Sequence, residues 1–118
     1  MKEQYITITG FRHYYGLIPF KIGKRLKCIK EPENPFDTEA IRVALKQIGT
    51  IGYVANSIHT VARGTSSAGA IAHSVKNSFI VEVMFMTDSH IICKIVEGQK
   101  EKQTPSGKKR YQNDCWDY

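Results

Sequence analysis

The segment 31–43 (EPENPFDTEAIRV) contains residues whose types and spacing could do chemistry. Its prolines and Asp37 indicate a compact turn with Phe36 at the tip. There the aromatic ring either closes a hydrophobic core or stays open and receives a flat ligand. The carboxylates of Asp37, Glu31 and Glu33 cluster in this turn. They could bind a metal or act as a base, or Asp37 could hold the turn by accepting bonds from backbone N–H groups.

A second cluster, residues 12–16 (RHYYG), combines cations with aromatic rings. Arg12 can bind a phosphate or a backbone carbonyl through its planar guanidinium. His13, Tyr14 and Tyr15 can stack on bases or pack over the mouth of a barrel. These are the ingredients of a site for single-stranded nucleic acid. The alternative is a pair of tyrosines that cap the core, with Arg12 in solvent.

No catalytic or metal-binding motif stands out elsewhere. The four histidines lack HxxxH or HExxH spacing, and the chain contains no P-loop or GxGxxG. Cys28 and Cys93 lie in expected strands and are predicted to be core residues, whereas Cys115 is a free thiol. We therefore expect no enzymatic activity, metal or cofactor. Two alternatives stay open: a metal-dependent hydrolase or nuclease that uses Asp37 and Glu33 on nucleic acid, and an adaptor for an acidic protein partner.

The charge is distributed unevenly. The 118 residues carry a net charge of +6, and the first thirty hold seven basic side chains against one acid, Glu3. This asymmetry favours an anionic partner. No apolar run reaches the roughly 18 residues of a membrane span. The chain begins without a signal-peptide pattern, and its three cysteines have no CxxC spacing, so we expect a cytoplasmic protein without membrane contact.

The elements that must position these clusters are mostly strands. Period-two alternation or apolar runs predict strands at residues 5–11, 25–30, 40–46, 51–54, 79–86 and 90–96. Asn56 or Ser57 is expected to cap a short helix that ends near Gly64, and residues 65–72 (TSSAGAIA) are a weaker candidate for a second helical turn. We predict a mainly β protein, a small six-stranded barrel with a short helical insert, over residues 1–97. Residues 98–118 are expected to form a basic, partly flexible tail.

Four segments carry a resemblance to a known family: GFRHYYG (10–16), LKCIKEPENPFD (26–37), AIRV (40–43) and IGYV (51–54). Together they resemble the HIRAN domain of helicase-like remodelling enzymes that act in replication-fork repair. The match extends over about residues 6–96. It implies an OB-like modified β-barrel that captures the 3′-hydroxyl end of single-stranded DNA. Implied partners are single-stranded DNA or DNA 3′ ends, with a separately encoded helicase or nuclease as a candidate second partner. Oligomeric state is left open.

The resemblance also implies a set of nucleic-acid-binding residues. They are Arg12, His13, Tyr14, Asn34, Phe36, Asp37, Tyr53, Asn56, Arg63 and Phe79. Phe36 corresponds to an aromatic that stacks on the terminal base, Asp37 to the carboxylate that binds the 3′-hydroxyl, and Phe79 to a second stacking aromatic. Tyr53 stands where relatives can carry a phosphate-contacting histidine. Asn56 stands where the family can use a lysine, and Arg63 is the candidate to supply that charge.

Overall fold

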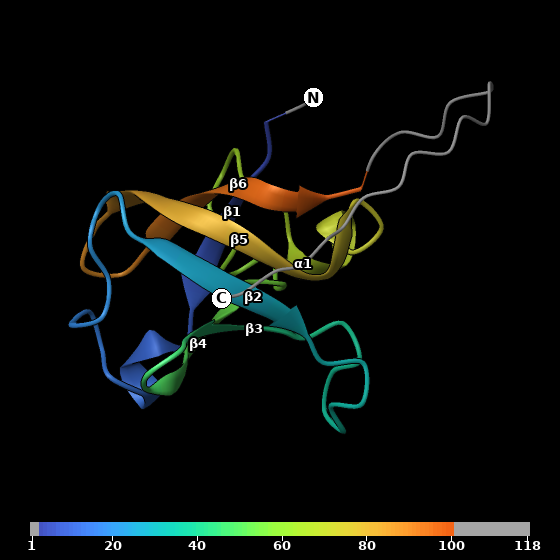
Figure 1. Ribbon diagram of the computed structural model, residues 1–118, viewed down its shortest axis with the longest axis horizontal. Helices are drawn as coiled ribbons and strands as arrows, with labels where there is room; N and C mark the ends of the chain where they lie inside the picture. Colours follow the sequence, from blue (N-terminus) through green and yellow to red (C-terminus); the bar gives the residue numbers. More distant parts are fainter. Residues whose placement is uncertain (1–2, 101–118) are drawn as a thin grey trace.

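Strands with alternating side chains close into an antiparallel barrel in the computed structural model (Figure 1). The structure describes residues 3–100. In that range the strands are β1 (Tyr5–Thr9), β2 (Arg25–Lys30), β3 (Ile41–Leu45), β4 (Gly49–Val54), β5 (Val75–Met86) and β6 (Ile91–Gln99). Their order around the barrel is β1-β4-β3-β2-β5-β6, and every neighbouring pair is antiparallel. The predicted six-stranded β-barrel is confirmed.

The barrel interior is filled by aliphatic side chains from every strand. Cys28 on β2 and Cys93 on β6 belong to this core, as predicted. Burial raises the pKa of the Cys28 thiol well above its usual value, and it raises the pKa of Cys93 to about 12. Both thiols therefore stay protonated and act as small apolar residues. Cys115 lies outside the described residues.

The first strand ends earlier than predicted, because the chain turns at Gly10. This glycine adopts a left-handed conformation with φ of 73°, and the conformational energy of that state is low for a residue without a Cβ atom. The following 3₁₀ helix, η1 (Phe11–His13), turns the Phe11 ring into the core. There the ring packs edge-on against Phe20, with 5.9 Å between centroids. The turn leaves the cations and tyrosines that follow Phe11 on the surface.

The helix predicted to run from Asn56 or Ser57 to Gly64 is wrong. Ser57 closes single turns instead, because its hydroxyl accepts from the N–H of His59 at 3.1 Å and its carbonyl from that of Val61 at 2.9 Å. Ile58 is 89% exposed, so the apolar spacing that suggested a helix has no buried face here. The insert does contain a helix, α1 (Ala68–Ile71), which begins eleven residues after Ser57 and is capped by Ser67.

Two further observations concern the ends and the surface. β6 continues to Gln99, two residues past the predicted domain boundary, and the predicted flexible tail lies almost wholly outside the described residues. Within the described part of the chain, no helix has both the length and the apolar character needed to cross a membrane.

Candidate nucleic-acid interface

The turn between β2 and β3 is held together by its own side chains. The Asn34 Oδ1 atom accepts from the N–H of Phe36 at 2.8 Å and from the N–H of Asp37 at 3.1 Å. The Asp37 Oδ1 atom in turn accepts from the N–H of Glu39 at 2.9 Å. Asp37 therefore has the turn-holding role. Phe36 is 94% exposed at the tip, so an ordered backbone presents a bare aromatic ring to solvent.

Glu31 fastens this turn to the barrel. Its Oε1 atom accepts from the Asn34 amide at 3.0 Å and from the Tyr53 hydroxyl at 3.1 Å. Its Oε2 atom lies 3.3 Å from Nε of Arg42 on β3. Burial, together with the Glu31 carboxylate, raises the pKa of Tyr53 to about 12, so the phenol remains a donor to Glu31 at neutral pH. A phosphate at this hydroxyl would have to compete with that carboxylate.

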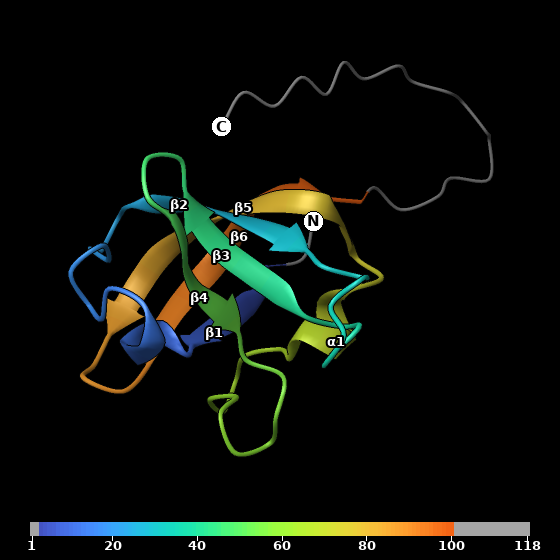
Figure 2. The same ribbon diagram turned by 90° about the horizontal axis from the view of Figure 1, so that it is seen from below.

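The second predicted cluster lies on the other side of β4 from the turn (Figure 2). Arg12, His13 and Tyr14 are all exposed on or next to η1. The Tyr14 ring lies 6.4 Å from the Tyr53 ring, at an interplanar angle of 40°. Tyr53 touches both predicted clusters, because its hydroxyl binds Glu31 of the turn. The structure thus brings together two motifs that lie about twenty residues apart in the sequence.

Arg12 is anchored at one side and open at the other. Its guanidinium lies over the Phe11 ring at 5.7 Å, and one terminal nitrogen donates to the backbone carbonyl of Asp88 at 2.6 Å. A guanidinium has five N–H donors, so most remain available to a phosphate. Arg12 therefore supplies a positioned positive charge beside the aromatic residues of η1.

Asn56 and Arg63 are arranged differently from each other. The Asn56 amide donates to the Glu39 carboxylate at 3.0 Å and accepts from the N–H of Gly69 at 2.9 Å, so both of its ends join the turn to α1. Arg63 is exposed in the following loop, and within residues 3–100 it forms no hydrogen bond or ion pair with the turn. The structure gives Asn56 a supporting role and leaves Arg63 apart.

The prediction that Phe79 is a surface stacking residue is wrong. Phe79 is 2% exposed and pairs with the inward-facing Cys28 across β2 and β5. Gly98 of β6 lies directly against it: a Cβ at this glycine would collide with the Phe79 side chain, and its φ of 95° also favours glycine. The ring is a core component that a ligand cannot reach.

Sequence reasoning did not identify Glu31 and Arg42 as the supports of the site. Glu31 stood out only as one member of a carboxylate cluster, and nothing local connects it to Tyr53, 22 residues away. One signal was present in the sequence, because polar and apolar side chains alternate along the strands β3 and β4. In the structure Arg42 pairs directly with Tyr53 across these two strands. Outward positions that pair across adjacent strands share a face.

Residues 3–100 contain no cluster of side chains that could form a metal site. No three His, Cys, Asp or Glu side chains in this range come together so that they could hold a metal ion.

A comparison with protein-family models identifies the family, and comparisons with solved structures show the same fold. The sequence model described as the HIRAN domain matches residues 1–72, more than half of the chain. The structure resembles the HIRAN domain of human HLTF, with a TM-score of 0.58 and 19% identity over 84% of this chain and 77% of that one. It also resembles a protein from Lactobacillus plantarum, with a TM-score of 0.54 and 16% identity over 80% of this chain and 93% of that one. Comparison with curated protein sequences finds no match.

Proposed function

This chain belongs to the HIRAN domain family, a family of nucleic-acid-binding modules, and we propose that it captures the 3′-hydroxyl end of single-stranded DNA at the turn between β2 and β3. The observation that carries the proposal is the Phe36 ring, 94% exposed on a turn that Asn34 and Glu31 hold in place. An aromatic ring that is exposed to this extent contributes little to folding, and its faces are free to stack on a base.

Stacking supplies the attraction. A base that stacks on an exposed aromatic ring contributes about 1–3 kcal/mol, regardless of which base it is. The bonds from Asn34 to the backbone of Phe36 and Asp37 order the turn before the ligand arrives. Less conformational freedom is then lost on binding, so more of the stacking energy remains as affinity.

Asp37 supplies the preference for an end. Among the described residues only its Oδ1 atom has a partner, the N–H of Glu39. The other oxygen can accept a hydrogen bond from a free 3′-hydroxyl. A phosphate in the same place would meet a like charge, so a strand that continues past this point, or ends in a phosphate, is disfavoured.

Cations around the turn supply the long-range attraction. The net charge of +6 and the exposed Arg12 draw a polyanion towards the aromatic residues. This contribution is independent of base sequence and weakens as salt rises.

The test compares two fluorescent oligothymidylates that differ only at the 3′ end, one with a hydroxyl and one with a phosphate. The native protein is expected to bind the hydroxyl form more tightly. Asp37→Asn keeps an acceptor for the N–H of Glu39 but removes the charge, so it should reduce the difference in affinity between the 3′-hydroxyl and 3′-phosphate oligonucleotides. Glu33→Gln removes an exposed carboxylate from the same turn and should leave the difference unchanged. Equal binding of the two oligonucleotides by the native protein would rule out end capture.

A further inference from the structure

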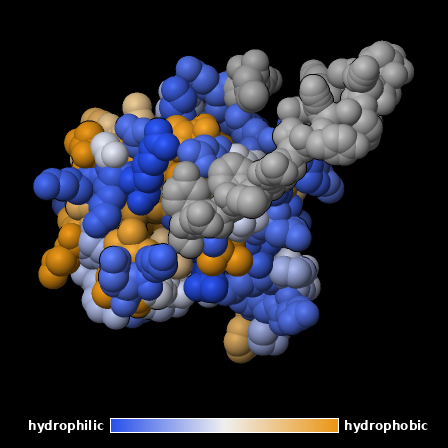
Figure 3. Space-filling view, viewed as in Figure 1, coloured by the Kyte–Doolittle hydropathy of each residue, from blue (hydrophilic) through white to orange (hydrophobic). Residues whose placement is uncertain are grey.

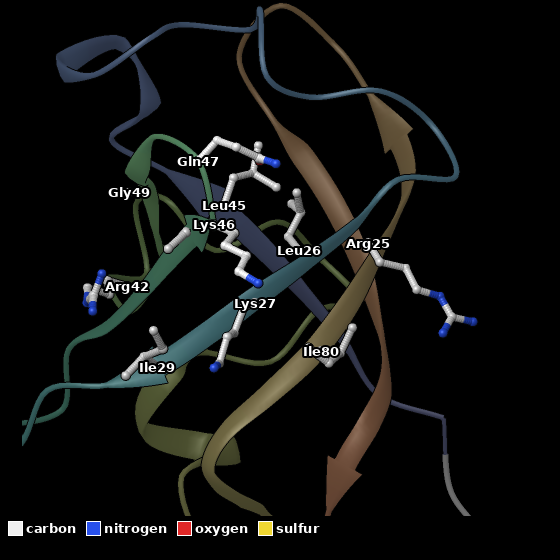
Figure 4. Close-up of a pocket in the computed structure, with 11 residues that line it drawn as sticks. Arg25, Leu26, Lys27, Ile29, Arg42, Leu45, Lys46, Gln47, Gly49 and Ile80 are labelled. Carbon is white, nitrogen blue, oxygen red and sulfur yellow. The ribbon is translucent and has the colours of Figure 1, made fainter. Parts of the chain in front are cut away.

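A groove of about 530 Å³ lies on the outer face of β2 and β3, away from the tip of the turn (Figure 4). Its lining contains the four cations Arg25, Lys27, Arg42 and Lys46 and no carboxylate. Apart from Gln47 and a glycine, hydrophobic side chains form the rest of its surface, chiefly those of Ile29, Leu45 and Ile80. On the face shown in Figure 3, hydrophilic side chains likewise surround smaller hydrophobic groups. The groove therefore combines positive charge with an apolar floor.

The two arginines of the groove already have partners. Arg25 lies 3.7 Å from the Glu82 carboxylate and 3.3 Å from that of Glu97. Arg42 is paired with Glu31, at 3.3 Å. Figure 4 shows these two arginines at opposite sides of the groove. Because protein carboxylates largely balance the charges of Arg25 and Arg42, these two arginines border the groove but contribute little attraction for an anion.

The two lysines have no such partners. Within residues 3–100, neither Lys27 nor Lys46 forms an ion pair or a side-chain hydrogen bond. Lys27 lies on β2 opposite Ala44, and Lys46 follows the end of β3, so both border the same stretch of apolar floor. Two unbalanced cations beside a hydrophobic floor match a ligand that carries spaced anions on an apolar body.

The groove continues onto the turn between β2 and β3. A second hollow, of about 580 Å³, is lined by the turn up to Pro35, and the carboxylates of Glu31 and Glu33 belong to this lining. The tip residue Phe36 lies beyond it. It shares Ile29 and Arg42 with the groove. The two hollows thus form one path from the turn along β2 and β3 towards the β3–β4 connection. A ligand held at the turn has this path as a direct continuation.

We propose that the groove binds the nucleotides on the 5′ side of the captured end, with Lys27 and Lys46 contacting successive phosphates of the strand. This inference rests on the proposed function, because the path starts at the turn. The apolar floor receives sugars or base faces, and the lysines contribute sequence-independent attraction. An acidic peptide would satisfy the charges, but the groove leads to residues 31–35 of the turn that also carries Phe36 and Asp37, which favours a nucleic-acid strand.

The experiment measures the affinity of the full chain for two oligothymidylates: one of about three nucleotides, shorter than the roughly 4–16 that an OB-type barrel binds, and one of about nine, within that range. The native protein should bind the longer strand more tightly. Lys27→Gln with Lys46→Gln should remove most of that gain, roughly tenfold, and lower the salt slope by about 1.4 for two phosphate contacts. Binding of the short strand should change little. Glutamine keeps most of the aliphatic chain, and thermal unfolding verifies that the variant is folded.

The matched control removes two positive charges elsewhere. Lys21→Gln with Lys94→Gln changes an exposed loop and β6, which lies across the barrel from β3. This control should keep the length-dependent gain. The proposal is overturned if both double variants lose it equally, if the native protein shows no gain, or if a polyglutamate peptide binds more tightly than the longer strand. The comparison of 3′ ends is separate: equal binding there would reject end capture, while the length dependence still reports on the groove.

Discussion

Phe36 and Phe79 are the same side chain in opposite surroundings. Phe36 is 94% exposed at the tip of a turn, and Phe79 is 2% exposed inside the barrel. The Phe79 ring is held by packing, with Gly98 and Cys28 beside it. Around Phe36 it is the backbone that is held, by hydrogen bonds to Asn34. An aromatic ring in a core stabilises the fold, whereas a ring on a pre-ordered turn is available for recognition.

The difference lies in what each region uses to stay ordered. The barrel uses buried apolar area, which excludes any ligand. The turn uses a polar network in which Glu31 binds Asn34, Arg42 and Tyr53, so its aromatic residue need not be buried. Separating the support of a site from its contact surface in this way lets the two be tested by different substitutions.

The largest expected effect is on the buried ring. Phe79→Ala removes a core aromatic ring and leaves a cavity, so the free energy of unfolding should fall by about 3–5 kcal/mol. Urea denaturation measures this. Phe36→Ala is the matched control and should change stability by less than about 0.5 kcal/mol, since the ring contacts little. Similar losses from both substitutions would contradict the contrast between the two rings.

An intermediate effect is expected at the support of the turn. Glu31→Gln breaks the ion pair with Arg42 and weakens the bonds from Tyr53 and Asn34, so stability should fall by about 1–3 kcal/mol. Glu33 is an exposed carboxylate two residues away, so the stability of Glu33→Gln should differ from that of the native protein by less than about 0.5 kcal/mol. Denaturant unfolding of the two variants gives the comparison. An unchanged Glu31→Gln variant would mean that the network does not hold the turn.

The smallest effect concerns pH. Because the pKa of Tyr53 rises from 10.0 in the unfolded chain to about 12 in the folded one, the unfolded chain releases this proton first. The free energy of unfolding should therefore decrease as pH rises from 10 to about 12, and Tyr53→Phe should remove this part of the decrease. Ultraviolet absorbance of the phenolate measures the titration directly. A Tyr53 phenol that titrates near its ordinary pKa of 10.0 in the folded protein would contradict the Glu31 contact.

Local patterns predicted the strands well. β2 begins and ends at the predicted residues, 25 and 30, because polar and apolar side chains alternate along it. The prediction of a helix after Ser57 was wrong because residue spacing alone cannot show whether an apolar face has a core to pack against. Ile58, which belongs to that face, is exposed to solvent. The same spacing is a helix signal only where a core lies beneath it.

The site was predicted in part, for a similar reason. Residues close together in the sequence placed Phe36 at the tip of the turn and favoured the turn role of Asp37, but they left open whether the Phe36 ring closes a core, and only the family resemblance favoured an exposed ring. The burial of Phe79 depends on its register with Cys28, and the role of Glu31 depends on contacts with Tyr53. Such long-range geometry is set by barrel closure, which a local pattern does not specify.

The most direct test of the central claim is the affinity of Phe36→Ala for a single-stranded oligonucleotide with a free 3′-hydroxyl. The loss of one stacking platform should weaken binding by about 1–3 kcal/mol while leaving the fold intact. Ile18→Ala is the control, since Ile18 is also exposed, at 91%, but lies on another loop. It should bind as the native protein does. Native affinity in Phe36→Ala, or an equal loss in Ile18→Ala, would contradict the account.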